Sequence, residues 1–536
     1  MGHFHMIKSI KSLVAGLVTS LITISCASQT NVNAFEDQNT SVEALSKKNT
    51  ISKNSVWQDQ IIYFVVTDRF SNGDKKNDFN VKNDPWAYHG GDFQGVINKL
   101  DYIKDIGATT IWITPPMDNR DIAFKADFGG GKMQDIWGYH GYWFKDFLAV
   151  DEHLGDMNKM KELITKAHAK GIKVLLDIVV NHVDYDHPFA KDKNNAQDKY
   201  YKWFNHHGKI NDNEWGDQWK VEHGELAELP DLDQTNPEVY DYLVKASKWW
   251  IQQAKPDGFR IDTIKHVGHD FWKKYTKDIH AYAGDDFLLL GEVYDSIPEN
   301  NANYIKDGLD STFDFPFYYA IKDVFGQGKS TRQLAKLFEK DNVYPNPNMM
   351  SPFIDNHDVP RFLHDAGNNG INKLKLAMAF TMTMRGIPTI YYGTEVALAG
   401  GADPDNRRDM PWSGKNANIT DYLKKLTSVR KDYESVRRGK QLEMWQDDQV
   451  YSFLRTSGDP NTEVITVINN SDSNQTRTIQ IRAESKMADG TQLKNALGSD
   501  GVSVNNKSIM VTLAPKEAKV FVVGSAKNSV KTVKKK

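Results

Sequence analysis

The sequence predicts an α/β protein: a (β/α)8, or TIM, barrel with a small domain inserted after its third strand and a C-terminal antiparallel β-sandwich. Three observations support this fold class. Between residues 56 and 438, eight short β-branched or aromatic runs alternate with segments of helical periodicity, which is typical of βαβ units. A long stretch rich in Trp, His, Asn and Asp, at 183–232, follows the third run. After Arg438 the pattern changes to short alternating runs separated by turn signals, at 439–525.

The composition is that of a large folded protein. The 536 residues carry a net charge of −3, so we expect no nucleic-acid partner. The single cysteine excludes intramolecular disulfides and Cys-x-x-Cys redox chemistry. Aromatic residues reach 11%, and many stand beside polar residues, an arrangement that suits sugar rings as well as an ordinary core.

The N-terminus predicts export. Lys8 and Lys11 precede a short apolar stretch at 13–24, which indicates a signal peptide over residues 1–26. Cys26 resembles the lipidated cysteine of a bacterial lipoprotein signal, and cleavage after Ala27 or Ala34 is the alternative. We therefore expect an extracellular protein or a cell-surface or periplasmic lipoprotein, with possible membrane attachment through a lipidated Cys26. Composition assigns the remaining end segments: a flexible tether at 27–55 and a basic tail at 526–536.

The barrel strands can be counted along the chain. The eight runs lie at 61–66, 110–114, 173–178, 258–261, 287–290, 311–313, 350–354 and 389–391, of which the sixth is the weakest. Active sites of such barrels lie at the C-terminal ends of the strands. The candidates are therefore the polar residues at or just beyond these ends: Asp177, Asn181, His182, Arg260, Asp262, Glu292, Asp355, Asn356, His357 and Asp358.

Two of these carboxyl groups have surroundings of opposite character. Arg260 and Asp262 point the same way because they alternate along one strand, and the guanidinium is expected to lower the pKa of Asp262, which suits a nucleophile. Glu292 follows an apolar run, where desolvation favours the protonated form of a general acid. Such a pair is what glycoside hydrolysis requires.

Seven motifs resemble those of glycoside hydrolase family 13, the α-amylase family, and the resemblance spans nearly all of 56–523. They are Asp177-Ile-Val-Val-Asn-His182, Gly258-Phe-Arg-Ile-Asp-Thr-Ile-Lys-His266, Leu290-Gly-Glu-Val293, Phe353-Ile-Asp-Asn-His-Asp358, Leu229-Pro-Asp-Leu-Asp233, Gly107-Ala-Thr-Thr-Ile-Trp-Ile-Thr-Pro115 and Gly386-Ile-Pro-Thr-Ile-Tyr-Tyr-Gly-Thr-Glu395. The chain is most similar to an exported bacterial α-amylase.

The resemblance implies a retaining double displacement. Asp262 would be the nucleophile, Glu292 the general acid and then base, and Asp358 the group that stabilises the transition state. Residues expected to hold the sugars are His140 and Tyr142 of Tyr139-His-Gly-Tyr-Trp143, His182, Arg260, Lys265, His266, His357, and the pair Asp403 and Arg407.

Calcium is implied at two places by the same resemblance. Asn181, Asp231 and the backbone oxygen of His266 form an all-oxygen set suited to Ca²⁺. A second set resembles an N-terminal calcium loop, for which an ordinary polar turn is the alternative. Its members are Asn72, Asp74, Asn77, Asp78, Gly90 and Asp92.

The function expected from these residues is endo-hydrolysis of α-1,4-glucosidic bonds in starch, glycogen or maltodextrins. Two related enzymes are alternatives: a cyclomaltodextrinase or neopullulanase, which usually carries a folded N-terminal domain, and a cyclodextrin glucanotransferase, whose extra starch-binding domains are not expected after Val523. A non-catalytic binding or transporter-associated subunit is disfavoured because the three carboxylates are present. The sequence carries no signal for a particular oligomeric state.

Overall fold

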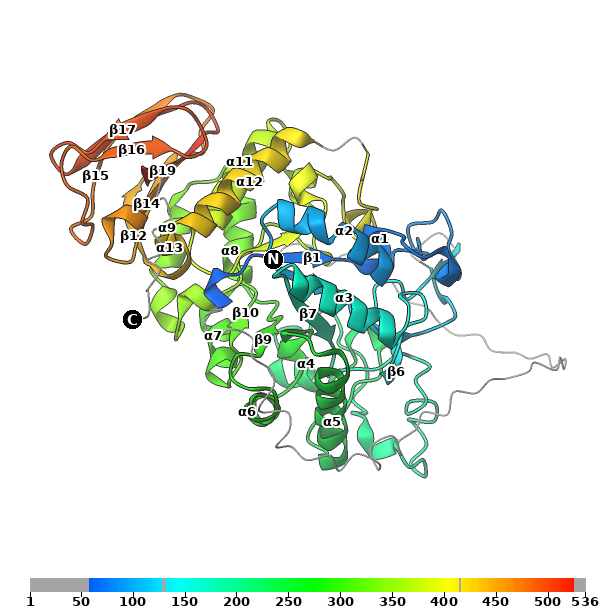
Figure 1. Cartoon of the computed structure of the whole chain (residues 1–536). Helices are drawn as coiled ribbons and strands as arrows, with labels where there is room; N and C mark the ends of the chain where they lie inside the picture. The colour runs from blue at the N-terminus through cyan, green and yellow to red at the C-terminus, as the bar shows by residue number, and fades with distance from the viewer. Residues whose placement is uncertain (1–56, 128–131, 414–415, 525–536) are drawn as a thin grey trace, which may run out of the picture.

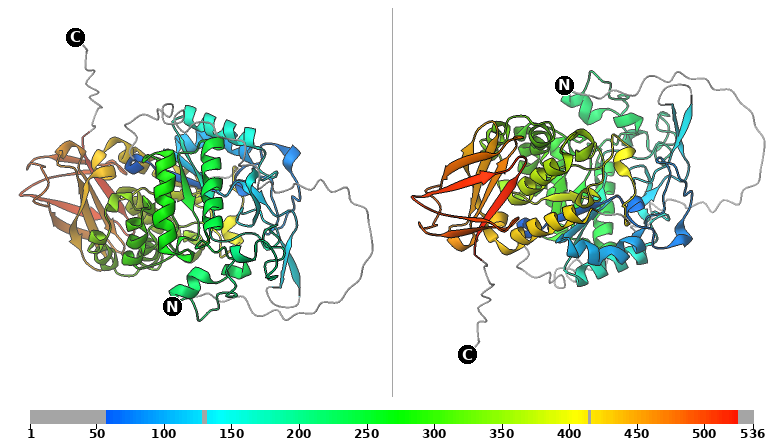
Figure 2. Two further views of the ribbon diagram at one scale, coloured as in Figure 1. Left: turned by 90° about the horizontal axis from the view of Figure 1, so that it is seen from below. Right: turned by 90° about the horizontal axis from the view of Figure 1, so that it is seen from above.

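The computed structural model describes residues 57–127, 132–413 and 416–524. The expected signal peptide with Cys26, the tether and the basic tail lie outside the described residues. Figure 1 shows a helix-covered barrel with a separate β-structure formed by the last part of the chain, and Figure 2 shows the two bodies side by side from two further directions. No helix of the described segments combines the length and the apolar character needed to cross a membrane.

A seven-stranded parallel sheet forms the wall of the barrel. Its strand order is β10 (Ser311–Thr312), β9 (Leu288–Gly291), β8 (Gly258–Ile261), β7 (Lys173–Ile178), β2 (Thr110–Ile113), β1 (Ile62–Val65) and β11 (Thr389–Tyr391). The central strands are buried along almost their whole length. Continuous apolar runs are typical of parallel strands that are covered on both faces.

The expected seventh strand, at 350–354, is reduced to two isolated bridges. Ser351 pairs with Phe313 beside β10, and Phe353 pairs with Thr389 of β11, so this segment joins the two edges of the sheet. The Thr389 N–H donates to the Pro352 carbonyl at 2.9 Å. Because Pro352 has no N–H to donate in return, a regular ladder cannot form here. The (β/α)8 fold class is confirmed, with this strand shortened.

Helices cover the sheet, and most of the longer ones are amphipathic. The longer ones are α2 (Phe93–Asp105), α3 (Met157–Ala169), α5 (Pro237–Ala254), α6 (His269–Ala283), α7 (Pro298–Lys306), α8 (Phe315–Ile321), α9 (Arg332–Phe338), α11 (Gly370–Thr383) and α12 (Ala417–Asp432). Of these, α8 and α11 are largely buried. The shorter ones are α1 (Thr67–Phe70), α4 (Gln218–His223), α10 (Phe362–Asp365) and α13 (Glu434–Arg438). Side-chain oxygens of Asp92, Asp156 and Asn236 cap the N-termini of α2, α3 and α5.

Two excursions leave the barrel on the side where its strands end. After β2 the chain forms two antiparallel pairs: β3 (Met117–Asn119) with β6 (Phe144–Val150), and β4 (Phe124–Asp127) with β5 (Met133–Ile136). After β7 the inserted segment at 183–232 is largely irregular and contains α4. Bridges from His182 to Asp231 and from Phe204 to Leu232 tie its end to its start. The second excursion follows the third barrel strand, as expected, whereas the first was not expected.

The C-terminal body has two layers. Six strands form an antiparallel sheet in the order β12 (Lys440–Gln446), β13 (Val450–Thr456), β14 (Val464–Asn469), β19 (Ala518–Val523), β16 (Gln492–Asn495) and β17 (Gly501–Ser503), and β15 (Gln475–Gln480) pairs with β18 (Ser508–Leu513). Apolar side chains of both layers, such as Ile465 and Ile509, share one buried cluster. This is the packing of a β-sandwich.

Candidate active site

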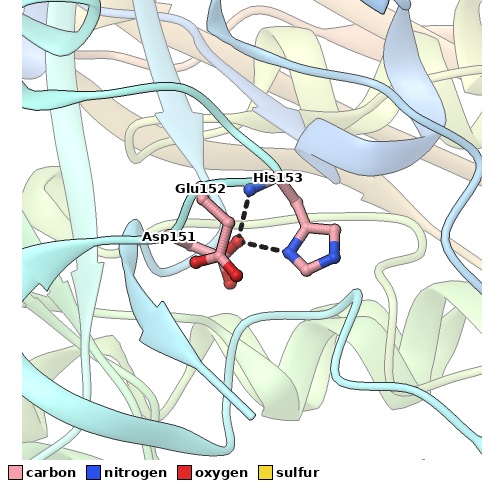
Figure 3. Close-up of side chains that lie close together, drawn as sticks. All are labelled: Asp151, Glu152 and His153. Carbon is pink, nitrogen blue, oxygen red and sulfur yellow. Dashed lines mark hydrogen bonds and ion pairs between the residues drawn. The ribbon is translucent and has the colours of Figure 1, made fainter. Parts of the chain in front are cut away.

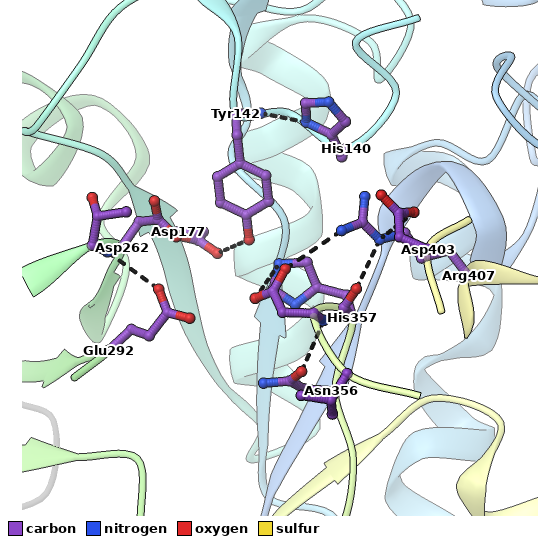
Figure 4. Close-up of polar contacts among 12 residues, drawn as sticks. His140, Tyr142, Asp177, Asp262, Glu292, Asn356, His357, Asp403 and Arg407 are labelled. Carbon is purple, nitrogen blue, oxygen red and sulfur yellow. Dashed lines mark hydrogen bonds and ion pairs between the residues drawn. The ribbon is translucent and has the colours of Figure 1, made fainter. Parts of the chain in front are cut away.

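The predicted catalytic residues Asp262 and Glu292 lie together at the C-terminal ends of the neighbouring strands β8 and β9 (Figure 4). Asp177 and Arg260 are partners in the parallel ladder between β7 and β8. Asp262 follows β8 directly, and Glu292 follows β9 directly. Asp358 comes from the segment that closes the ring of strands. The order of the strands in the barrel therefore places carboxyl groups from three distant parts of the chain at one end of the barrel.

Arg260 is the common partner of three of these carboxylates. Its Nη1 lies 2.9 Å from Asp177 Oδ1 and 2.6 Å from Asp262 Oδ1, and its Nη2 lies 2.9 Å from Glu292 Oε2. The guanidinium is fully buried, and its planar fork fixes the relative positions of the carboxylates that it contacts. The Thr263 N–H also donates to Glu292 Oε2, at 3.2 Å.

Burial raises the pKa of both central carboxyl groups. The pKa of Glu292 rises to about 7 because burial disfavours the charged form, with Arg260 opposing the shift. The expectation of a lowered pKa for Asp262 was wrong: burial raises the pKa of Asp262 to about 6, although Arg260 acts in the predicted direction. The sequence shows the guanidinium neighbour but not how completely the carboxylate is removed from water; Asp262 is only 7% exposed.

Asp358 stands at the more open side of the group. Its side chain is 32% exposed, and Arg407 Nη2 lies 3.4 Å from its Oδ1. Partial burial, together with the charge of Glu292, raises the pKa of Asp358 above its usual value. Arg407 Nε lies 3.3 Å from Asp403 Oδ1 and donates to the His357 carbonyl at 2.9 Å. The predicted pair Asp403 and Arg407 is therefore connected to the catalytic carboxylates by the contact between Arg407 and Asp358.

Aromatic and imidazole rings form the wall beside Asp177. The Tyr142 hydroxyl donates to Asp177 Oδ2 at 2.8 Å, and the Tyr142 ring stacks on His357 and on His140, with ring centroids 5.3 and 5.7 Å apart. His182 contacts the Tyr142 carbonyl at 3.3 Å. Burial lowers the pKa of His182 to about 4 and also lowers the pKa values of His140 and His357. These imidazoles are therefore neutral near pH 7 and suited to hydrogen-bonding uncharged hydroxyl groups.

Lys265 and His266 lie in the short helical turn after β8. Lys265 Nζ donates to the Tyr294 carbonyl at 3.3 Å and lies 3.8 Å from Asp295 Oδ2, while His266 Nδ1 lies 3.1 Å from the Val221 carbonyl in α4. This turn therefore joins the barrel to the inserted segment.

The first expected calcium set converges in the structure. The Asn181 side-chain oxygen lies 3.1 Å from Asp231 Oδ1 and 2.9 Å from the His266 carbonyl oxygen, so three oxygen atoms face one another; a turned amide would instead donate to both. Asp231 is buried, and burial raises its pKa well above the usual value. A cation among these oxygens would relieve that desolvation, so the set fits Ca²⁺.

In the second expected calcium set, only some of the oxygen atoms are free of hydrogen-bond donors and so available to a cation. Asn72 Nδ2 lies 2.8 Å from Asp78 Oδ1, and both lie where a Cβ on Gly90 would collide with them. Asn77 Oδ1 is a buried acceptor without a hydrogen-bond partner, which suits a cation. Asp92 instead accepts from three N–H groups, those of Gly73, Asp74 and Gly95. Asp74 Oδ1 accepts from Lys76 N.

An acidic cluster next to this loop was not expected (Figure 3). Asp151, Glu152 and His153 bring potential ligand atoms within 4.8 Å of one another. Asp151 Oδ1 already accepts from both His153 N and His153 Nδ1, each at 2.8 Å. Asp151 is thus already engaged, whereas His153 Nε2 is buried without a hydrogen-bond partner; we assign the cluster no ligand.

Two supporting residues were missed by the sequence reasoning. Trp112 Nε1 donates to Asp177 Oδ2 at 2.9 Å, and Asn406 Nδ2 donates to the carbonyls of His357 and Val359 at 2.7 and 3.0 Å. Both lie within motifs or beside them, but only their position in the fold shows that they hold active-site groups in place.

Together these groups can perform acid–base chemistry on an uncharged, hydroxyl-rich ligand. Buried carboxyl groups with raised pKa values supply a proton donor and an acceptor. Neutral imidazoles and the Tyr142 ring supply hydrogen bonds and a flat apolar face. The fold and the site thus define a glycoside hydrolase of the (β/α)8 class.

Comparison with known proteins agrees with this class. The family described as the catalytic domain of alpha amylase matches residues 64–457. The chain therefore belongs to the α-amylase family, glycoside hydrolase family 13.

Among its relatives is a Beta/alpha-amylase of Paenibacillus polymyxa, 43% identical over 90% of this chain; the chain spans only 39% of that protein's length. A cyclomaltodextrinase of Thermoanaerobacter pseudethanolicus is 34% identical over 77% of this chain and 70% of that protein. The solved structure of an Anoxybacillus α-amylase superposes with a TM-score of 0.79 at 38% identity, over 88% of this chain and 98% of that one.

Proposed function

We propose that the protein is an endo-acting, retaining hydrolase of α-1,4-glucosidic bonds in starch, glycogen or maltodextrins. The observation that carries the proposal is the buried Arg260, which holds Asp262 and Glu292 beside each other at distances of 2.6 and 2.9 Å. A nucleophile and an acid with raised pKa values, fixed on one guanidinium, are the two groups that a double displacement needs.

In the first step, Asp262 attacks the anomeric carbon of the bound glucose while Glu292 donates its proton to the leaving glycosidic oxygen. The bond to that oxygen breaks, and a covalent glycosyl ester forms on Asp262. In the second step, Glu292 takes a proton from water, whose oxygen attacks the same carbon and releases Asp262. Asp358, held by Arg407, stabilises the positive charge that develops in both transition states.

The remaining site residues position the sugar. Tyr142 lies beside the glucose ring whose glycosidic bond is cleaved. The neutral imidazoles of His140, His182 and His357 form hydrogen bonds with the hydroxyls of that glucose. Lys265 and His266 contact the leaving part of the chain, and Asp403 and Arg407 hold the opposite part. A structure titled as a complex of a Geobacillus thermoleovorans α-amylase with acarbose, 38% identical over 87% of this chain, supports a glucan-like ligand for this fold.

Two other activities have specific support. One is cyclomaltodextrinase activity, which is supported by the cyclomaltodextrinase relative described above. The other is supported by the solved structure of a cyclomaltodextrin glucanotransferase with a three-domain ABC distribution, 32% identical over 87% of this chain and 99% of that one. We expected no extra starch-binding domains after Val523, but a glucanotransferase with three domains shows that this expectation does not distinguish a glucanotransferase from an amylase.

Product analysis on four substrates separates the three activities. For an α-amylase we expect fast loss of iodine staining on soluble starch, with few reducing ends per unit of staining lost, and slow attack on β-cyclodextrin. The other two substrates, maltoheptaose and pullulan, report product length and branch tolerance. A tenfold preference in kcat/KM for β-cyclodextrin over starch, about 1.4 kcal/mol, would replace the proposal by a cyclomaltodextrinase. Cyclodextrins formed from starch would replace it by a glucanotransferase.

We further propose Ca²⁺ as a structural ion at Asn181, Asp231 and the His266 carbonyl, with a second ion in the loop of Asn72, Asn77 and Asp78. The first ion would join the barrel to the inserted segment, because its ligands come from both. The facing oxygens of the first set and the unpartnered Asn77 Oδ1 support the two sites.

Export is proposed from the first 26 residues alone. Cell fractionation and palmitate labelling of wild type and Cys26→Ala test it. A labelled wild type and an unlabelled variant would support a lipoprotein; an unlabelled, secreted wild type would replace it by full secretion.

A further inference from the structure

An exposed aromatic group lies on the inserted segment, outside the catalytic site. Trp219 of α4 is 52% exposed, and it is the only exposed tryptophan of the 13 in the chain, all of which lie among the described residues. Its ring stacks on His223 at 4.9 Å and 15°, and His207 lies 4.7 Å away at 59°. We call Trp219, His223 and His207 the aromatic platform.

The aromatic platform is anchored to the turn that carries the proposed leaving-side residues. Gln218, next to Trp219 in α4, donates from Nε2 to the Lys265 carbonyl at 3.4 Å. From the same helix, the Val221 carbonyl contacts His266 Nδ1 at 3.1 Å. Trp215, just before the helix, packs edge-on against the His266 ring at 5.9 Å. The helix that carries Trp219 and His223 therefore packs on the turn that holds the proposed leaving-side residues.

We propose that the aromatic platform binds the α-glucan chain beyond the cleavage site, as an extension of the leaving side; this rests on the function proposed above. The exposed indole offers a flat apolar surface, and the C–H face of a glucose ring is a ligand that packs on such a surface. His207 and the Nε2 atom of His223 offer hydrogen-bonding nitrogens for the sugar hydroxyls, while His223 Nδ1 contacts the Trp219 carbonyl at 2.8 Å. The occupant must be long, because the platform lies outside the group of catalytic carboxylates.

Chain-length kinetics test the proposal. We expect Trp219→Ala to raise KM for soluble starch about fivefold, roughly 1 kcal/mol, with kcat within twofold and with kcat/KM for maltotriose unchanged. Trp219→Phe keeps a flat ring and is expected to retain most of the affinity. Met510→Ala, which removes a 69% exposed apolar side chain on the C-terminal body, is the matched control and is expected to change neither value. Equal loss on starch and maltotriose, or none on either, would overturn the proposal.

Binding without turnover separates this inference from the proposed function. The probes are Glu292→Gln and Glu292→Gln/Trp219→Ala in native gels that contain soluble starch. Retardation of the first variant and clearly weaker retardation of the second supports the platform. Equal retardation of both overturns the platform and leaves the proposed function standing. No retardation of either variant, with no turnover by wild type, would overturn both.

Discussion

Asp262→Asn tests the nucleophile and its electrostatic setting in one variant. The substitution removes the attacking oxygen but preserves size, so we expect kcat on soluble starch to fall by at least about 10⁴-fold, roughly 5 kcal/mol of barrier. The same variant is expected to be more stable than wild type. Burial raises the pKa of Asp262 from 3.8 to about 6, an increase of about two pH units, and at 1.36 kcal/mol each the ionised form costs up to about 3 kcal/mol of folding stability.

The sign and the pH range follow from the direction of the shift. A carboxyl group whose pKa is higher in the folded state destabilises the protein when ionised, so the cost is full above about pH 6 and absent below about pH 4. Arg260 keeps two partners, Asp177 and Glu292, when Asp262 is neutralised. The gain in stability of Asp262→Asn should therefore be largest near pH 7 and vanish near pH 4.

The assay pairs reducing-sugar release with thermal unfolding of the same preparations. Asp101→Asn, which neutralises a carboxylate with an 84% exposed side chain, is the control and is expected to change neither activity nor stability by much. Activity of Asp262→Asn within about tenfold of wild type would refute its role as nucleophile. A melting temperature below that of wild type at pH 7 would refute the electrostatic argument.

Three further expectations follow from the site. The rate kcat/KM should fall below about pH 6, where Asp262 takes a proton, and above about pH 7, where Glu292 loses one; a flat profile from pH 5 to 8 would contradict this assignment. A calcium chelator should lower the melting temperature of wild type, and Asp231→Asn should start lower and respond less, whereas equal responses in a calcium titration would count against that site. Asp177→Asn, which weakens the contacts with Trp112, Tyr142 and Arg260, should lower kcat about 100-fold with a smaller change in KM; a change confined to KM would show that Asp177 does not position the catalytic groups.

The sequence predicts the barrel wherever a strand is a short run of mainly β-branched, aromatic or other apolar residues. The strands β1, β2, β7 and β8 lie within the predicted runs, and β9 ends one residue beyond its run, at Gly291. The segment at 350–354 is equally apolar, but Pro352 interrupts its hydrogen bonding, and only two bridges remain. The short strands β3 to β6 carry polar residues and have no clear period, so nothing in their sequence distinguishes them from a loop.

Site residues can be predicted where a reactive side chain directly follows a strand. They are harder to predict where their role depends on contacts between distant segments. Asp262 and Glu292 are found because each directly follows an apolar run. Trp112 and Asn406 support the site through contacts between segments that are far apart in sequence, which no local pattern reveals. The pKa of Asp262 depends on the balance between burial and one guanidinium, and only the structure supplies the burial.

The coupling between the two carboxyl groups explains how Glu292 could serve both steps. The negative charge of Asp262 is one cause that raises the pKa of Glu292, which keeps Glu292 protonated as the acid of the first step. When Asp262 becomes a neutral ester, that repulsion disappears while Arg260 stays in contact with Glu292. The pKa of Glu292 must then fall, and the ionised carboxylate is the base that the second step requires. In the proposed cycle, the charge of Asp262 itself switches the protonation of its neighbour.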